Sequence, residues 1–104
     1  MNKNRKYSLV VAKEYEEWFE DQTAREKTQI AARLMKIELS GHFGDNKYLN
    51  HDVWELRWKS GRRIYYAYLA VKNILLILGG NKNGQGKDIA KAKKILRRET
   101  GAEA

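Results

Sequence analysis

The chain of 104 residues contains no cysteine and no proline, and it has no long hydrophobic run. Without cysteine it can form neither a disulfide bond nor a thiolate zinc site, so its stability must come from packing. A membrane-spanning helix would need about 18 consecutive apolar residues, which the sequence does not offer. The N-terminal stretch MNKNRKYS also lacks the apolar segment of a secretion signal. We therefore expect a cytoplasmic protein that does not enter a membrane.

Positive charge is abundant, and it is concentrated in the second half of the chain. Residues 1–52 hold nine Lys/Arg and nine Asp/Glu, whereas residues 53–104 hold twelve Lys/Arg and four Asp/Glu. The second half therefore carries the whole net charge of +8, which is typical of a surface that meets nucleic-acid phosphates. Lysine-rich helices that are simply soluble would give the same totals. At this length we expect one domain, residues 1–104.

Hydrophobic spacing predicts a helical hairpin in the first half of the chain. A short edge strand is expected at residues 6–10, and the first helix follows it with one apolar stripe: Val11, Tyr15, Trp18 and Phe19. Thr23 and Glu26 have the spacing of a capping box, in which each side chain accepts a hydrogen bond from a free backbone N–H. The second helix should therefore begin near Thr23 and continue to Gly41, which can adopt the left-handed conformation that ends a helix.

A small sheet and a last helix are predicted in the second half. Residues 42–52 have turn-like signals, and alternation then begins in VWELRWK, with Glu55, Arg57 and Lys59 on one face. The segment IYYAYL returns the chain, and the run ILLIL, apolar on both faces, is expected in the middle of the sheet. A helix over residues 86–98 ends the domain. The predicted order is βααβββα, an α+β fold in which the N-terminal helical hairpin packs on a small antiparallel sheet with a C-terminal helix.

The turn between the first two of these strands admits two registers. A loop of residues 60–61 would place Arg63 beneath the sheet beside Trp58. A loop of residues 60–62 instead pairs Lys59 with Arg63 and gathers the cations on one face. We favour the longer loop, because an arginine buried under the tryptophans would need a partner that the sequence does not offer.

Phosphate-loop and metal motifs do not fit this sequence. In GGNKNGQGKDI the spacing of Gly80 and Gly86 is one residue too long for an ATPase phosphate loop, and Asp88 stands where the magnesium-binding hydroxyl should be. His42 and His51 lack the tight spacing of a metal site, so two solvated loop histidines are the preferred interpretation. We therefore expect no cofactor and no metal ion.

The remaining candidates are cations and aromatic residues on the predicted sheet. Arg57 and Arg63 share a face in the favoured register, and Lys82 enters from the loop after the central strand. Such a cluster can cleave RNA without a metal, because the 2′-hydroxyl is itself the nucleophile. The protein need only orient it, accept its proton and neutralise the phosphorane charge. Arginine suits this charge because its fork binds two phosphate oxygens. A nucleic-acid-binding surface without chemistry is the alternative.

Several stretches, in this order along the chain, resemble one family of small proteins. They are IAARLMKIELSGHFGDNK, VWELRW, GRRIYY and LILGGNKNGQGKDIAKAKKI. Together they resemble the RelE/ParE superfamily of type II toxins, and most closely its HigB-like branch of addiction module killer proteins. The similarity covers nearly the whole chain, including the helical hairpin. It implies a bacterial toxin that is neutralised by a cognate antitoxin, commonly a helix-turn-helix protein encoded beside it.

The resemblance also implies an activity and a set of residues. RelE-like members cut mRNA in the ribosomal decoding site without a metal and leave a 2′,3′-cyclic phosphate. By position, the family's strand cation falls on Arg57, its transition-state arginine on Arg63 and its loop cation on Lys82. We therefore predict a ribosome-dependent endoribonuclease whose partners are an antitoxin and mRNA on the ribosome.

RNA binding is predicted to involve cations around this cluster and on the last helix. Five lysines are assigned to the RNA: Lys47, Lys59, Lys87, Lys91 and Lys94. Tyr65, Tyr66 or Tyr68 could stack on a base, and Tyr66 is the residue that we assign.

The proton acceptor and the class of function each have alternatives. Glu55 is favoured over His51 as the acceptor by its place on the strand, while its structural alternative is an ion pair with Arg57 or Arg63. ParE-like relatives share the fold and poison DNA gyrase without cutting RNA, and a basic binding module would not be toxic. Retention of the cation cluster favours the nuclease.

Overall fold

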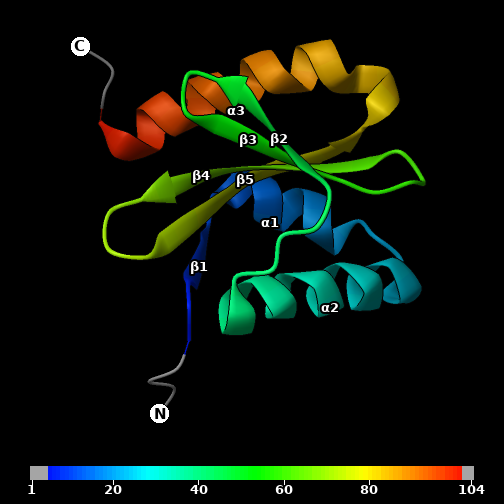
Figure 1. The fold of residues 1–104 in the computed structure, drawn as a ribbon. Coiled ribbons are helices and arrows are strands. Elements are labelled where there is room, and N and C mark those ends of the chain that lie inside the picture. The colour runs from blue at the N-terminus through cyan, green and yellow to red at the C-terminus, as the bar shows by residue number, and fades with distance from the viewer. Residues whose placement is uncertain (1–4, 102–104) are drawn as a thin grey trace.

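A five-stranded sheet with helices on both faces forms the centre of the computed structural model, which describes residues 5–101 (Figure 1). In chain order the elements are β1 Ser8–Val11, α1 Lys13–Glu20, α2 Ala24–Ser40, β2 Asn46–Asn50, β3 Val53–Arg57, β4 Arg62–Leu69, β5 Asn73–Asn81, the 3-10 turn η1 Lys82–Gly84 and α3 Gln85–Thr100. The α+β class, the helical hairpin and the C-terminal helix are confirmed. Residues 1–4, which begin the N-terminal stretch considered above, and residues 102–104 lie outside the described part. No helix within residues 5–101 is long and apolar enough to cross a membrane.

The strands lie in the order β1-β5-β4-β3-β2, so the last strand in the chain is inside the sheet. β1 pairs with β5 in parallel, and the other neighbouring pairs are antiparallel. Residues 74–78 of β5 are buried, as their apolar sequence predicts. The prediction of turns over residues 42–52 is wrong for β2. This edge strand pairs with β3 alone, and because four of its five residues are exposed, NKYLN carries no apolar alternation.

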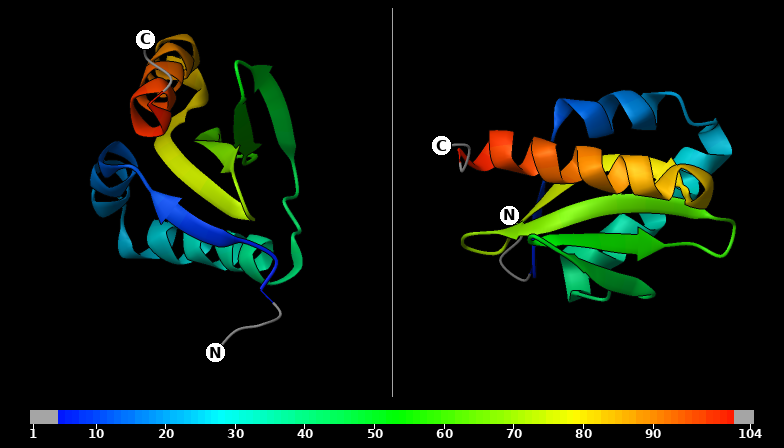
Figure 2. Two further views of the ribbon diagram at one scale, coloured as in Figure 1. Left: turned by 90° about the vertical axis from the view of Figure 1, so that its left-hand side faces the viewer. Right: turned by 90° about the horizontal axis from the view of Figure 1, so that it is seen from above.

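Two hydrophobic layers hold the helices to the sheet, with α3 and α2 on opposite faces (Figure 2). Three residues of α3 are buried in the first layer: Ala92, Ile95 and Leu96. The second layer contains one residue of α1 and three of α2: Tyr15, Ile30, Leu34 and Ile37. The end of the sheet where β3 stops and β4 starts therefore lies between two helical layers, next to the first turn of α3.

The helix ends follow the predicted signals, with one exception. The Thr23 side chain accepts a hydrogen bond from the Glu26 backbone N–H at 3.1 Å, and the Glu26 carboxylate accepts one from the Thr23 N–H at 2.9 Å. Gly41 ends α2 with a left-handed φ of 70°. Val11, however, does not belong to the apolar stripe of α1. It pairs with Leu76 as the last residue of β1 and is 42% exposed.

Gly79 in β5 marks a close approach of the sheet to α1. A Cβ at this position would overlap the indole ring of Trp18. We expect Gly79→Ala to lower the free energy of unfolding by about 1–3 kcal/mol, because the indole would have to leave its packed position. Urea unfolding would measure the change.

Gly86→Ala in α3 is the matched control for this substitution. Nothing lies within 4 Å of the Cβ position at Gly86, and alanine favours a helix over glycine. Its stability should equal or exceed that of the wild type. Equal stability of Gly79→Ala and the wild type would contradict the packing of Trp18 against β5.

Candidate functional site

The candidate site lies where β3 ends and β4 begins, beneath the first turn of α3. Arg57 pairs with Arg63 across these strands, and Glu55 pairs with Tyr65. Alternate residues of a strand share a face, so all four side chains are on the same face of the sheet. This is the α3 face, because Tyr65 packs in the layer that contains α3. The structure therefore brings Glu55, Arg57 and Arg63 together.

The turn that joins these strands differs from the favoured register. The Trp58 N–H donates to the Arg62 carbonyl at 3.1 Å, and the Gly61 N–H donates to the Trp58 carbonyl at 3.0 Å. The loop is therefore Lys59–Gly61, and the predicted pairing of Lys59 with Arg63 is wrong. Gly61 adopts a φ of 103°, which glycine tolerates best, so the loop ends at this residue. The observed register differs from the favoured one by two residues. Because this number is even, Arg57 and Arg63 stay on one face of the sheet, while Lys59 lies exposed in the loop.

Glu55 is a buried carboxylate held between two arginines. Its Oε2 accepts a hydrogen bond from Nε2 of Gln85 and lies 3.8 Å from Nε of Arg63. Its Oε1 lies 3.9 Å from Nε of Arg57. The side chain of Glu55 is 0% exposed, and a buried charge is strongly unfavourable unless it is paired. The arginines therefore stabilise Glu55 in the fold, and Glu55 in turn holds the two guanidinium groups beside each other.

The two arginines differ in their access to solvent. The side chain of Arg63 is 9% exposed, and its Nη1 donates to the carbonyls of Trp58 and Arg62 at 3.1 and 2.9 Å. The side chain of Arg57 is 38% exposed and also approaches Oδ2 of Asp45 at 4.0 Å. Arg57 is thus the arginine that presents its charge to the surface, whereas Arg63 is packed behind it.

Two lysines lie at the rim of this cluster. The Lys82 backbone N–H donates to the Gly61 carbonyl at 2.8 Å, and its side chain lies across Gly61, 3.4 to 3.6 Å from the Cβ position there. Lys47 in β2 pairs with Glu55, so it points to the same face. Both lysines are exposed. The end of the sheet therefore places Lys47 and Arg57 on the face of the buried Glu55, while Lys82 lies beside the loop that joins β3 to β4.

Burial raises the pKa of two further groups on this face. The carboxylate of Asp88 in α3 occupies the space above Gly80 that a Cβ would fill, and burial raises the pKa of Asp88. Burial and the carboxylates of Glu55 and Asp88 raise the pKa of Tyr65, so its hydroxyl stays protonated at neutral pH. That hydroxyl is buried and interacts with the carboxylate of Glu55.

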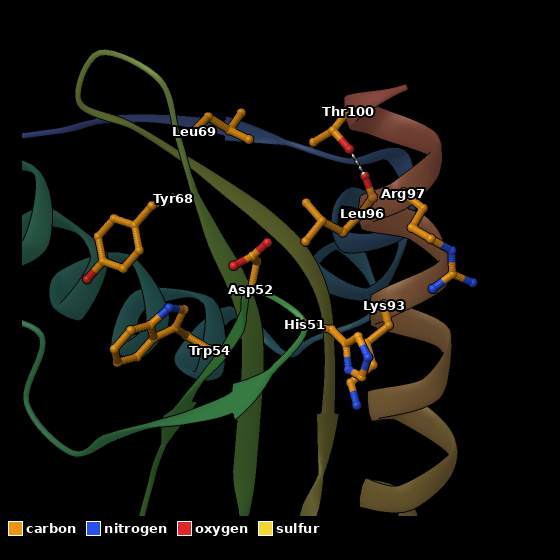
Figure 3. Close-up of a pocket in the computed structure, with 9 residues that line it drawn as sticks. All are labelled: His51, Asp52, Trp54, Tyr68, Leu69, Lys93, Leu96, Arg97 and Thr100. Carbon is orange, nitrogen blue, oxygen red and sulfur yellow. Dashed lines mark hydrogen bonds between the residues drawn. The ribbon is translucent and has the colours of Figure 1, made fainter. Parts of the chain in front are cut away.

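His51 and Tyr66 are not part of this cluster. His51 is in the turn before β3, at the end of that strand away from the loop that joins β3 to β4. It lines a separate cavity of about 430 Å³ near the C-terminal half of α3, with Lys93 and Leu96 (Figure 3). Tyr66 is 1% exposed and stacks on Phe43 with ring centroids 5.5 Å apart, so its assignment to base stacking is wrong. Alternation places it on the face that α2 covers.

The predicted cations of α3 are all on the surface. Lys87, Lys91 and Lys94 are exposed, and Lys91 and Lys94 line a groove between α3 and Glu14 of α1. Lys87 lies two residues after Gln85, so it projects from the side of α3 that faces away from the sheet.

Sequence reasoning missed two residues that build the site. Gln85 reaches Glu55 from α3, and its only signal is its place in the motif GGNKNGQGKDI. Arg33 in α2 donates to the carbonyls of Phe43, Asp45 and Arg57, and its guanidinium lies 4.4 Å from the ring of Trp58. Burial lowers the pKa of Arg33, though the group stays charged. No local pattern marks Arg33, because its partners are ten or more residues away.

Comparison with known proteins gives a family match and a curated relative. The profile of the phage-derived Gp49-like protein family matches residues 17–99. An uncharacterised protein of Haemophilus influenzae is 40% identical over 80 residues, which cover 74% of this chain and 78% of that protein.

Solved structures of the Escherichia coli RelE toxin have the same fold. The isolated toxin gives a TM-score of 0.62 at 16% identity, over 82% of this chain and 97% of that chain. A chain of the intact RelBE toxin–antitoxin complex gives 0.62 at 19% identity, over 72% and 95%. A double mutant of RelE in the free state gives 0.66 at 17% identity, over 84% and 93%. The predicted RelE-like fold is therefore confirmed.

Proposed function

We propose that this chain, which belongs to the phage-derived Gp49-like family and has the fold of the RelE toxin, is the toxin of a toxin–antitoxin pair and cuts mRNA on the ribosome. The observation that carries the proposal is the buried carboxylate of Glu55 between Arg57 and Arg63. The assignment of this chain to the HigB-like branch stays a prediction. A cytoplasmic antitoxin is the expected partner, by analogy with the RelBE complex.

The proposed chemistry is transfer within the RNA strand itself. The 2′-oxygen attacks the adjacent phosphorus, its proton passes to Glu55, and the bond from phosphorus to the 5′-oxygen breaks. The leaving 5′-oxygen takes a proton from water, and the hydroxide that remains takes the proton from Glu55 and so restores the base. The products are a 2′,3′-cyclic phosphate and a 5′-hydroxyl. Arg57 and Lys82 stabilise the phosphorane charge from the surface, and Arg63 does so through Nη2, because its Nη1 is bound to two carbonyls.

Access to Glu55 requires Arg57 to move. In the free protein Glu55 is fully buried and Oε1 faces Nε of Arg57 at 3.9 Å. That distance and the 4.0 Å contact with Asp45 are long, and the side chain of Arg57 is 38% exposed, so Arg57 can leave Glu55 while Arg63 and Gln85 continue to pair with the carboxylate. A phosphate at the rim would attract the guanidinium away from Glu55 and uncover Oε1. The same movement would both bind the charge and expose the base.

The RNA backbone is proposed to follow the exposed lysines around the cluster and along α3. From the cluster outward these are Lys47, Lys59, Lys87, Lys91 and Lys94. Each phosphate contact adds affinity without sequence preference, which suits a toxin whose register on the message is set by the ribosome.

The proposal is tested by brief expression of the protein in a bacterial host, followed by primer extension on cellular mRNA. We expect growth arrest and discrete cuts within translated messages, in frame with the codons. The same message without its start codon is the control and should stay intact, because it is not on the ribosome. Arrest without cuts but with trapped gyrase–DNA complexes would instead identify a gyrase poison. Normal growth would favour a binding module that is not toxic.

A further inference from the structure

We infer that Gln85 is a positioning residue for Glu55, and that α3 thereby completes the catalytic site. Gln85 is the first residue of α3, and its side-chain Nε2 donates to Oε2 of Glu55 in β3, thirty residues earlier in the chain. The contact itself belongs to the fold. Its effect on catalysis rests on the function proposed above.

The two oxygens of Glu55 have different surroundings. Oε2 receives the hydrogen bond from Gln85 and lies 3.8 Å from Nε of Arg63. Oε1 faces Nε of Arg57 at 3.9 Å and accepts no hydrogen bond from the described residues. Gln85 therefore fixes the rotation of the carboxylate, so that Oε1 is the oxygen left for a proton from RNA. A general base must be held in such a geometry to act efficiently.

A neutral amide suits this position better than a third cation. The groups that face Glu55 come from four elements: Lys47 on β2, Arg57 on β3, Arg63 and Tyr65 on β4, and Gln85 on α3. The cations already compensate the buried charge. An amide can orient the carboxylate by a hydrogen bond and adds no net charge to the cluster.

The path of the chain after β5 places Gln85 above Glu55. The Asn81 side chain accepts a hydrogen bond from the Asn83 N–H at 2.9 Å, and this closes the turn η1. Asp88, one helical turn after Gln85, seats its carboxylate above Gly80 of β5. Residues three apart lie on the same side of a helix, so Gln85 and Asp88 together hold the first turn of α3 against the sheet. This accounts for Gln85 and Asp88 in the motif GGNKNGQGKDI.

The test compares Gln85→Leu with Arg98→Gln. The first removes the donor to Glu55 and keeps most of the side-chain volume. The second removes the contact of α3 with Glu14 of α1, at 2.6 and 2.9 Å, without touching the cluster. On ribosomes loaded with a defined message, we expect Gln85→Leu to lower kcat by about tenfold to a hundredfold with KM nearly unchanged. Arg98→Gln should retain the wild-type kcat. Urea unfolding of both variants corrects for any loss of stability.

A measurement without activity separates this inference from the proposed function. In the wild-type protein, the side-chain amide protons of Gln85 should exchange slowly with solvent, and their NMR signals should move when Glu55→Gln removes the charged acceptor. If Gln85→Leu cuts mRNA as fast as the wild type, the positioning role is wrong while the nuclease stands. If the wild type cuts no mRNA but the amide signals behave as expected, the proposed function fails and the contact stands. Fast exchange of the Gln85 amide in the wild type would overturn the contact itself.

Discussion

Replacing Arg57 with alanine is expected to abolish growth arrest and to leave the fold intact. Its side chain is 38% exposed and its contact with Asp45 is long at 4.0 Å, while Arg63 and Gln85 continue to pair with the buried Glu55 when Arg57 is lost. We therefore expect a smaller loss of stability than for Arg63→Ala. In the reaction, however, Arg57 is the exposed guanidinium that would meet the phosphorane. Loss of one such group lowers the rate by about a hundredfold to a thousandfold in well-studied enzymes. The cleavage rate on loaded ribosomes and the urea midpoint would measure both effects.

Arg25→Ala and Arg63→Ala are the two variants with which Arg57→Ala is compared. Arg25 is an exposed arginine of α2, far from the cluster in sequence, and its loss should change neither toxicity nor stability. Arg63→Ala should lower both, because it leaves the buried Glu55 with one ion-pair partner fewer. Full toxicity of Arg57→Ala would remove Arg57 from the proposed mechanism. A large loss of stability in that variant would show that Arg57 acts mainly in the fold.

Arg33→Met is expected to cause the largest loss of stability, about 3 kcal/mol or more. The guanidinium donates to the carbonyls of Phe43, Asp45 and Arg57 at distances from 2.6 to 3.1 Å. Methionine keeps an apolar side chain over Trp58 and removes every donor. The three carbonyls then lose charged partners in a partly buried place. Urea unfolding would give the difference directly.

Lys36→Met is the matched control for Arg33→Met. It lies in the same helix, is exposed and removes the same charge. Its stability should stay within about 0.5 kcal/mol of the wild type, as is usual for surface positions. If both variants lose the same small amount, the bonds from Arg33 do not hold the segment before β2 in solution. If only Arg33→Met loses stability, cleavage should fall as well, since the backbone of Arg57 is one of its partners.

The parts of the fold that sequence predicts well depend on short-range physics. The capping box at Thr23 and the stop at Gly41 involve residues a few positions apart, and both are observed. The buried strand β5 is marked by its own composition. β2 was beyond such reasoning, because a polar edge strand is defined by its neighbour rather than by its own side chains.

The candidate site, too, could be predicted only in part from the sequence. The shared face of Arg57 and Arg63 depends only on whether the register is odd or even, so it survives the shift of the loop to Lys59–Gly61. Which cation is exposed depends on packing from other layers, and here Arg63 proves to be the buried one. The hydrogen bond from Gln85 to Glu55 joins residues thirty positions apart, and no periodicity connects them.

The pairing of β1 with β5 has a consequence for synthesis of the protein. Residues 8–11 find their partners only in residues 73–76, so a nascent chain cannot close its sheet until that late segment has left the ribosome. At about 5–20 residues per second, the gap between the two strands is roughly 3–12 seconds of translation. Gln85 emerges later still. A chain of this topology therefore completes its sheet only after most of its own translation, and the proposed activity would be absent until then.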